Sequence, residues 1–253
     1  MPLTQSFYPT PSKDFNSLPN SLISEQFQLC QSRLLELTFT PPDYPADRVF
    51  SGSNINLYFD PHHPQQFKRP DWFGVLGVDK LYQRQNIRTS YVAWQESFNP
   101  FIVVEFLSSD TATEDLGQTP VGVDAIPTKW DVYERFLRIP YYILFDPETN
   151  QLEGFQIIGS HYEELEVKNQ RLWIPELELG LGLCPDIYEG LERQWLRWYD
   201  VKGNLLELQK NQRQTGQPNP ELIQKREQID QQQKLGQKLT DRLKKFGLKV
   251  DSI

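Results

Sequence analysis

Hydrophobic positions recur at helical spacing near the start of the chain and at strand spacing in its middle. In residues 21–36, apolar side chains follow one another at three-, four- and seven-residue intervals, which predicts an amphipathic helix. From residue 53 the period changes to two, and four segments predict strands: 54–60, 71–78, 101–107 and 141–146. The last two are apolar enough to be central strands that are covered on both faces. Residues 128–139, between them, predict a helix.

Beyond residue 150 the pattern becomes that of hairpins. Short apolar or alternating runs are separated by turn residues such as Gly159-Ser160 and Lys202-Gly203-Asn204. Leucines alternate over residues 177–183, so a strand or a bulge explains the glycines in this run better than a functional glycine motif. The order of helix, strands, crossover helix, strand and hairpins predicts an α/β fold with a mixed central β-sheet, flanked by helices and followed by C-terminal hairpins.

The two ends of the chain differ from this middle part. Residues 1–20 contain several Pro, Ser and Asn and predict a loose arm, so we expect the α/β domain to span residues 21–203. Residues 204–253 are rich in Gln and Lys, and the segment 221–248 has apolar positions near helical spacing. We expect a solvated helical tail there. The alternative is a short coiled coil with a second copy of the chain, which would make the protein a homodimer.

The charge of the chain excludes one class of function. The net charge is −8 at pH 7, and residues 204–253 hold ten Lys or Arg against six Asp or Glu, so the acidity lies in the first 203 residues. A protein that coats nucleic acid through bulk positive charge is excluded, because such binding needs a basic surface. An enzyme that holds a divalent metal with carboxylates and meets phosphates only locally remains compatible with this balance.

Membrane and secreted proteins are not indicated either. No apolar run approaches the roughly 18 residues that a membrane helix needs. The first residues lack a basic stretch followed by an apolar one, so they do not resemble a secretory signal. The two cysteines, Cys30 and Cys184, are too few for a disulfide framework or a thiolate metal site. We therefore expect a cytoplasmic protein without membrane contact.

Two carboxylates lie in or beside apolar runs. Glu105 lies inside the run 101–107, where a carboxylate loses hydration and needs a cation or hydrogen-bond donors. The alternative is a glutamate at a strand end that faces solvent or pairs with an arginine. Asp71 follows Pro70 at the predicted start of a strand. For Asp71 the alternative is an ordinary turn aspartate.

Lys129 is placed by helix geometry. At about 100° per residue, it lies in the middle of the apolar face of the predicted helix 128–139. The solvent side carries two pairs at four-residue spacing, Asp131/Arg135 and Glu134/Arg138. A lysine on the buried face needs a carboxylate or phosphate oxygen as partner, unless its chain bends back to solvent from the first helical turn.

Two carboxylates from neighbouring strands and a lysine directed at them form a recognisable chemical set. Clustered carboxylates repel one another and favour a hard divalent cation, Mg²⁺ or Mn²⁺. Such a cation activates water and offsets the charge of a phosphoryl transition state, and the lysine stabilises the same charge. The three residues therefore indicate metal-dependent hydrolysis of phosphodiester bonds.

These residues also belong to a larger pattern. In order and spacing, the chain resembles the Uma2 family, a group of proposed restriction endonucleases of the PD-(D/E)XK type. The motifs that carry the resemblance are Pro70-Asp71, the run 103–109 with Asp115 downstream, Lys129-x-x-x-Tyr133 and the run 140–147. The resemblance covers the chain from residue 20 to residue 200. It implies a restriction-endonuclease-like core with Asp71 and Glu105 as metal ligands.

Departures from the family pattern bear on the site. The parent signature places a lysine two residues after the glutamate, where this chain has Leu107, and Lys129 matches the family's lysine on the following helix. Most members have Glu-Tyr-Trp where this chain has Tyr141-Tyr142-Ile143. Glu36 matches the family's early glutamate, and Asp115 is the other weaker candidate.

The expected function is a Mg²⁺- or Mn²⁺-dependent endonuclease that acts on DNA, with Asp71, Glu105 and Lys129 as catalytic residues. The alternative is a catalytically silent member of the fold that serves as a nucleic-acid-binding or protein-interaction module. On the sequence alone, Lys129→Met is expected to leave stability unchanged or to raise it, because the cost of holding a cation near the core disappears.

Overall fold

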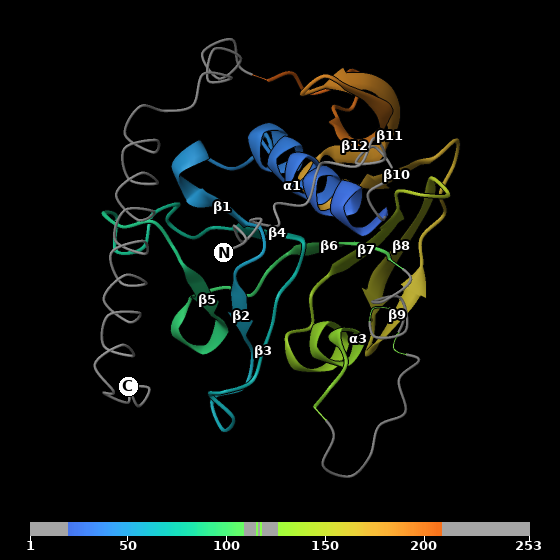
Figure 1. Ribbon diagram of the computed structural model, residues 1–253. Helices are drawn as coiled ribbons and strands as arrows, with labels where there is room; N and C mark the ends of the chain where they lie inside the picture. The colour runs from blue at the N-terminus through green and yellow to red at the C-terminus, as the bar shows by residue number, and fades with distance from the viewer. Residues whose placement is uncertain (1–19, 109–114, 116, 118–125, 209–253) are drawn as a thin grey trace, which may run out of the picture. The chain divides into compact units, whose positions relative to one another are not determined.

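A mixed β-sheet occupies the centre of the fold (Figure 1). The computed structural model describes residues 20–108, 115, 117 and 126–208, and among them six strands pair in the order β1-β4-β6-β7-β8-β9. The bounds of these strands are β1 Val49–Gly52, β4 Trp72–Leu76, β6 Ile102–Phe106, β7 Tyr141–Asp146, β8 Gln151–Ile158 and β9 His161–Glu164. β6 and β7 run parallel and the other neighbours antiparallel. β4, β6 and all but the last residue of β7 are buried, as their continuous apolar runs predict.

One face of this sheet is covered by helix α1 Asn20–Thr38 and by a second, antiparallel sheet (Figure 1). The second sheet consists of β10 Arg171–Ile174, β11 Leu179–Tyr188 and β12 Leu191–Tyr199, with the short helix η5 Pro175–Leu177 between its first two strands. The side chain of Gln31 both donates to the carbonyl of Leu196 and accepts from its N–H, each at 2.9 Å, which ties α1 to β12. Phe39 packs with its ring centroid 5.1 Å from those of Trp72 and Trp198 and joins α1 to both sheets.

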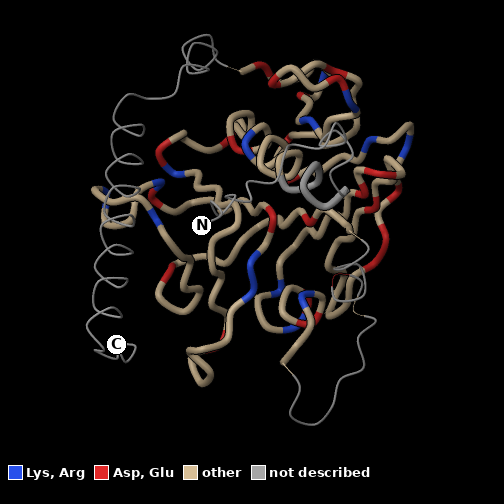
Figure 2. Tube along the Cα trace, viewed as in Figure 1, with Lys and Arg blue, Asp and Glu red and all other residues tan. Residues whose placement is uncertain are grey.

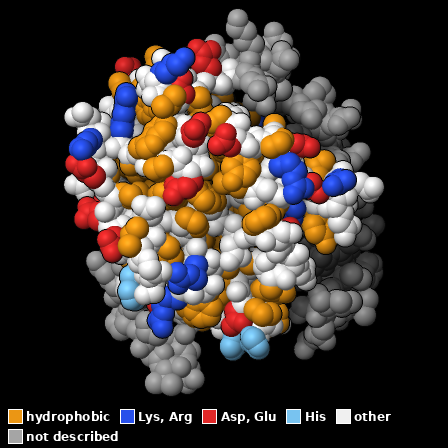
Figure 3. Space-filling model, turned by 180° about the vertical axis from the view of Figure 1, so that it is seen from behind, with side chains coloured by type: hydrophobic (Ala, Val, Ile, Leu, Met, Phe, Trp, Pro, Cys, Tyr) orange, Lys and Arg blue, Asp and Glu red, His pale blue; other side chains and the backbone are white. Residues whose placement is uncertain are grey.

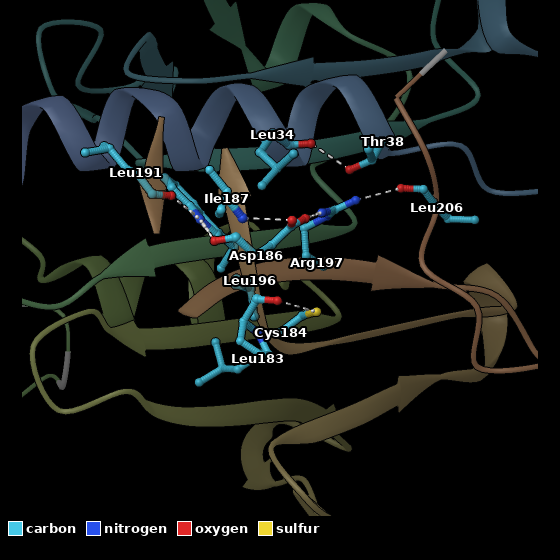
Figure 4. A network of polar contacts seen from close by, with 12 residues as sticks. Leu34, Thr38, Leu183, Cys184, Asp186, Ile187, Leu191, Leu196, Arg197 and Leu206 are labelled. Carbon is cyan, nitrogen blue, oxygen red and sulfur yellow. Dashed lines mark hydrogen bonds and ion pairs between the residues drawn. The ribbon is translucent and has the colours of Figure 1, made fainter. Parts of the chain in front are cut away.

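A polar network holds the C-terminal hairpin together (Figure 4). The buried guanidinium of Arg197 pairs with the carboxylate of Asp186 across β11 and β12 and donates to the carbonyl of Leu206 at 3.1 Å. The indole N–H of Trp195 donates to the carbonyl of Asp186 at 3.1 Å. These bonds connect groups that are close in the hairpin, and they involve none of the predicted site residues.

The other face of the central sheet is covered by a small three-stranded sheet and by the helix that carries Lys129 (Figure 1). The small sheet has the order β3-β2-β5, with bounds β2 Asn56–Tyr58, β3 Phe67–Lys68 and β5 Ser90–Val92. Short helices η2 Ala46–Arg48 and η3 Ala93–Gln95 flank β1 and β5. Leu57 and Tyr91 are fully buried and share one hydrophobic core with Phe73 and Val103 of the central sheet.

The Lys129 helix is short and changes its winding. It consists of α3 Lys129–Asp131 followed by the π-helical turn η4 Val132–Phe136. Thr128 caps α3 by accepting from the N–H of Asp131, whose carboxylate accepts in return from the N–H of Thr128. In the wider turn, the N–H of Leu137 bonds to the carbonyl of Val132 at 2.9 Å.

Of the two ion pairs predicted on the exposed face of this helix, the structure shows one. The pair between Asp131 and Arg135 forms at 3.5 Å. Glu134 is instead buried and accepts from the N–H of Tyr162 at 2.8 Å, while Arg138 donates to the carbonyl of Gly159. Arg138 is exposed as predicted, but the predicted solvent position of Glu134 was wrong. A π-turn adds a residue per turn and so rotates positions away from the 100° wheel.

The predicted fold class is confirmed: the described residues form a mixed α/β fold with a central mixed sheet and C-terminal hairpins. The predicted loose arm at 1–20, apart from Asn20, lies outside the described residues, and so does the predicted helical tail from residue 209 onward. In the described start of the predicted tail, residues 204–208, the N–H of Leu206 donates to the carbonyl of Trp198 on β12 at 2.9 Å. Of the helices in the described ranges, none combines the length and apolar character that crossing a bilayer requires.

Candidate active site

Asp71 and Glu105 face each other because two adjacent strands set them in register. β4 pairs with β6 so that Trp72 lies opposite Val104, which brings the residue before Trp72 beside the residue after Val104. The N–H of Asp71 donates to Glu105 Oε2 at 3.1 Å, and the N–H of Phe106 donates to Asp71 Oδ2 at 2.7 Å. Each carboxylate is therefore bonded to the backbone of the other strand. The structure brings this predicted pair together.

Glu105 is the most enclosed group of the site. Its side chain is fully buried, in the middle of the central sheet. Oε1 accepts from the hydroxyl of Tyr133 at 2.7 Å, and Oε2 accepts from the ammonium of Lys129 at 3.0 Å. Both oxygens thus have donors, as a buried carboxylate requires.

Lys129 bridges two carboxylates. Its Nζ lies 3.0 Å from Glu105 Oε2 and 3.0 Å from Asp115 Oδ1, and the side chains of these two acids are 0% and 1% exposed. The hydroxyl of Tyr142, on β7, donates to the backbone carbonyl of Asp115 at 3.0 Å and so holds that residue against the sheet. The predicted direction of Lys129, into the acidic cluster, matches the geometry, and Asp115 joins the same cluster.

Burial and mutual repulsion shift the titration of both carboxyl groups of the pair. Burial raises the pKa of Glu105 to about 7, with the charge of Asp71 adding to the rise and Lys129 opposing it. Burial also raises the pKa of Asp71, again against the charge of Lys129. Burial alone would lower the pKa of Lys129, but the carboxylates of Glu105 and Asp115 outweigh it and raise that pKa. The lysine is therefore a permanent cation, while Glu105 titrates near neutral pH.

Glu36 does not join this cluster. It lies partly exposed on α1 and forms an ion pair with Arg33 of the same helix at 3.0 Å. The contact of α1 with the site comes instead from Ser32, one turn earlier, whose hydroxyl donates to the backbone carbonyl of Asp71 at 3.0 Å. The weak family match at Glu36 thus points to the helix that contacts the site, but Glu36 itself pairs with Arg33 away from the cluster.

Tyr133 and Tyr142 were not proposed as site residues from the sequence, although each contacts a site acid. The signal for Tyr133 was its place one turn after Lys129 on the buried face, because a buried tyrosine hydroxyl needs a hydrogen-bond partner. For Tyr142 the signal was weaker. It lies in an apolar strand of aromatic and aliphatic residues, and nothing in that run shows which ring contacts the segment with Asp115.

The donor set fits a hard divalent cation in part. Among the described residues, no group of three or more His, Cys, Asp and Glu is arranged to hold a metal ion. Mg²⁺, however, is commonly bound by one or two protein carboxylates and completes its shell with water and substrate phosphate. Asp71 and Glu105 supply two such carboxylates on neighbouring strands, each bonded to the backbone of the other strand. The residues present therefore fit Mg²⁺ or Mn²⁺ as a two-carboxylate site.

The hydroxyl of Tyr133 should help to keep Glu105 ionised. Tyr133→Phe removes the bond to Oε1 and is expected to raise the pKa of Glu105 by about one unit, since a hydrogen bond to a charged group contributes about 1.5–3 kcal/mol. The measurement is a pH titration of the carboxyl carbon by NMR, with ¹³C-labelled glutamate and no metal. Tyr162→Phe is the matched control, because the Tyr162 hydroxyl donates to the carbonyl of Ile139 and not to Glu105. Equal titration curves for both variants would contradict this role of Tyr133.

Comparison with known proteins identifies a family and a similar solved structure. A family model described as "Uma2: Putative restriction endonuclease" matches residues 22–187. A solved structure described as a putative nuclease belonging to DUF820, from Anabaena variabilis ATCC 29413, is similar with a TM-score of 0.39 and 11% sequence identity. That similarity covers 67% of this chain and 76% of the other. No curated protein matches the chain.

Proposed function

Because the chain belongs to the Uma2 family, we propose that it is a nuclease that hydrolyses internal phosphodiester bonds of DNA with the help of Mg²⁺ or Mn²⁺. The observation that carries the proposal is the set of Asp71, Glu105 and Lys129. Two carboxyl groups from neighbouring strands are bonded to each other's backbone, and a buried ammonium lies on one of them. The proposed metal ligands are Asp71 and Glu105.

The electrostatics of the site support a cation at this pair. Burial raises the pKa of Glu105 to about 7, and the charge of the neighbouring Asp71 adds to this rise. A divalent ion would remove the repulsion between the two carboxylates and favour the ionised form of both groups. When bound, Mg²⁺ supplies positive charge for the phosphate oxygens in the transition state and makes water a stronger nucleophile.

The chain's own residues have distinct parts in this proposal. The side chain of Lys129 is 13% exposed, and its ammonium holds Glu105 and Asp115 inside the acidic cluster. There it can stabilise the negative charge that develops on a phosphate oxygen, at a position that is set before the substrate arrives. Asp115 fixes Lys129, and Tyr133 fixes Glu105 through Oε1. Asp71 is more exposed than Glu105, so in this proposal it faces the substrate.

Cleavage assays test the proposal directly. Supercoiled plasmid and circular single-stranded DNA are incubated with the full chain and Mg²⁺ or Mn²⁺. Asp71→Asn and Glu105→Gln are expected to lower the rate of cleavage by at least about 100-fold, as for the loss of a preorganised electrostatic group. Glu36→Gln is the matched control, because it removes a carboxylate of the same domain whose partner is Arg33, and it should retain the wild-type rate. A wild type that cuts neither DNA with either metal would contradict the proposal.

A catalytically silent nuclease-fold module is the second candidate function. It is favoured by the closed pairing of the cluster, in which Lys129 already provides a cation for Glu105 and Asp115. Metal binding distinguishes the two functions even without a known substrate. A ligand that binds only the folded state raises the melting temperature, so an active site should show a rise with Mn²⁺ that Glu105→Gln abolishes. A melting temperature that does not respond to either metal would favour the silent module.

A further inference from the structure

Three aromatic side chains form an exposed cluster on the small sheet. Tyr58 lies on β2, Phe67 on β3 and Trp94 on the short helix that follows β5. The ring centroid of Tyr58 lies 5.5 Å from that of Phe67 and 6.4 Å from that of Trp94. Phe67 is 40% exposed and Trp94 is 38% exposed. We call these three residues the aromatic platform.

The platform is not part of the hydrophobic core. Residues alternate between the two faces of a strand, and on the small sheet Leu57 and Tyr91 occupy the inner face, where both are fully buried. Tyr58 and Phe67 therefore point to the outer face, away from the central sheet. Exposed aromatic side chains that gather in one patch are typical of interaction surfaces, because they do not contribute to the packing of the core.

A cation is fixed at the edge of the platform. Arg69 is exposed, and its guanidinium donates twice to the side-chain oxygen of Asn56, at 3.1 and 2.9 Å. The guanidinium carbon lies 5.9 Å from the centre of the Phe67 ring. This arrangement leaves donors of the guanidinium available for an anion while its orientation is held from β2.

The outer face of the small sheet, on which the platform lies, carries fewer acidic side chains than other parts of the surface, so it repels a polyanion less. In the three short strands, the described outward-facing residues include no acid: they are Asn56, Tyr58, Phe67, Ser90 and Val92. By contrast, acidic positions gather along the β8–β9 edge (Figure 2), which includes Glu163 and Glu164. On the side of the molecule opposite to the view of Figure 1, hydrophobic side chains lie among separate acidic and basic ones (Figure 3). The net charge of −8 is thus not spread evenly over the surface.

The platform is joined to the candidate active site by a short stretch of chain. The chain runs from Phe67 through Arg69 and Pro70 directly to Asp71, so Phe67 and Asp71 are at most about 14 Å apart along the backbone. On the other side, Phe59, which follows β2, packs on Phe136 of η4 with ring centroids 5.2 Å apart. The small sheet and the Lys129 helix therefore lie side by side at the site.

We propose that the aromatic platform stacks unpaired bases of single-stranded DNA and that Arg69 binds the adjoining phosphate, so that the strand reaches Asp71 unpaired. The inference rests on the proposed nuclease function, because it names the form in which that site takes its substrate. Stacking on aromatic rings beside a positive charge is how proteins hold single strands without reading their sequence. A duplex keeps its bases stacked inside and offers no ring face to the platform.

Oligonucleotide binding without metal tests the proposal. The full chain, in EDTA, is titrated into a fluorescein-labelled single-stranded 20-mer of mixed sequence and into the blunt duplex of the same sequence, and anisotropy is followed. We expect tighter binding of the single strand. Phe67→Ala and Trp94→Ala should each weaken it by about 5- to 100-fold, since stacking contributes about 1–3 kcal/mol per base. Arg69→Met should lower the slope of log affinity against log salt by about 0.7, as for the loss of one phosphate contact on a single strand.

Three further variants separate stacking from a general apolar contact. Trp94→Tyr should retain most of the affinity, because the ring is kept, whereas Phe67→Leu should lose it although its side chain stays apolar. Ile187→Ala is the control: Ile187 is 66% exposed on β11, outside the platform, and its loss should leave binding unchanged. All of these positions are exposed, and equal melting temperatures show that the variants are folded.

Several outcomes would overturn the proposal. These are a wild type that does not bind the single strand, equal binding of strand and duplex, and platform variants that bind like wild type. A change from dimer to monomer in Phe67→Leu, measured by sedimentation, would show that the platform binds a second copy instead. If the wild type cleaves DNA but the platform variants bind normally, the platform proposal alone fails. If single strands bind through the platform and no metal supports cleavage, the nuclease proposal alone fails.

Discussion

Lys129→Met is expected to destabilise the fold by about 3–5 kcal/mol at pH 8, the usual cost of removing one partner from a buried ion pair. The ammonium lies 3.0 Å from both Glu105 and Asp115, and the structure leaves these two side chains 0% and 1% exposed. Methionine matches the length of the aliphatic chain but leaves two carboxylates buried without their cation. The measurement is urea unfolding in EDTA, so that no metal replaces the lost charge.

The destabilisation should depend on the charges that Lys129 compensates. Adding Asp115→Asn to Lys129→Met should recover a large part of the lost stability, because one of the two uncompensated carboxylates is then neutral. Lys168→Met is the control for a lysine in a surface pair. Lys168 and Glu166 have side chains that are 73% and 72% exposed, and such pairs contribute about 0–1 kcal/mol. Equal losses for Lys129→Met and Lys168→Met would contradict the compensating role.

This expectation reverses the one that follows from the sequence alone. The helical wheel places Lys129 on the buried face. From this position alone, only the free-energy cost of burying its charge can be inferred, and removing that charge is then expected to leave the protein as stable or more stable. The structure adds two buried acids that the same ammonium neutralises. The expected effect of Lys129→Met on stability therefore changes from neutral or stabilising to destabilising, since an unpaired buried carboxylate costs more free energy than a paired one. The direction of a side chain was predictable from the helical period, but the number of its partners was not.

The strands that build the site were predictable because their patterns are unambiguous. Continuous apolar runs at 101–107 and 141–146 predicted central strands, and both are buried in the central sheet as β6 and β7. The proximity of Asp71 and Glu105 was predicted from their places on adjacent strands. The register of β4 and β6 brings the two residues side by side. Asp115 came from the family resemblance, because no period or motif of the chain placed it at Lys129.

The small sheet could be predicted only in part: β2 lies within the predicted strand 54–60, but β3, β5 and the pairing of the three strands were not predicted. β2 and β5 pair in parallel although residues 59–89 separate them, and β3 has two residues. Strands this short lack enough positions for a period to be recognised, and their pairing is decided by tertiary contacts. β1 was missed for a related reason: Val49–Gly52 is a short strand that ends in Ser51 and Gly52. The aromatic platform depends on the pairing of these strands, so it became visible only with the fold.

The stability of the metal-free protein should fall as pH rises from about 4.5 to about 7 by an amount that Glu105 determines. The pKa of Glu105 is about 7 in the folded protein against a usual value of 4.5, because burial disfavours its charged form. Between these two values the folded state binds a proton that the unfolded state has lost. A rising pH therefore favours unfolding, by roughly 3 kcal/mol over the whole window. The raised pKa of Asp71 acts in the same direction.

Glu105→Gln isolates this contribution. Glutamine keeps the shape of the side chain but does not titrate, so the free energy of unfolding of the variant, relative to wild type, should rise by roughly 3 kcal/mol between pH 4 and pH 8. Surface acids cancel in this difference. Asp79, for example, has a pKa lowered by hydrogen bonds from Arg84 and Arg48, so its contribution is lost at low pH in both proteins. Glu36→Gln, measured in parallel, should give a difference that does not change with pH.

Added Mg²⁺ should remove the same dependence in the wild type. A divalent cation binds the ionised carboxylates, so it lowers the pKa of Glu105 in the folded state and stabilises the protein most above pH 7. The curve of unfolding free energy against pH should therefore flatten or rise with Mg²⁺ in wild type, while Glu105→Gln shows little response. A wild-type curve that keeps its downward slope at saturating Mg²⁺ would show that Glu105 holds its proton instead of a metal. The buried carboxyl pair would then be a structural element of β4 and β6, held by Lys129 and Tyr133, and the silent module would be the better description of this domain.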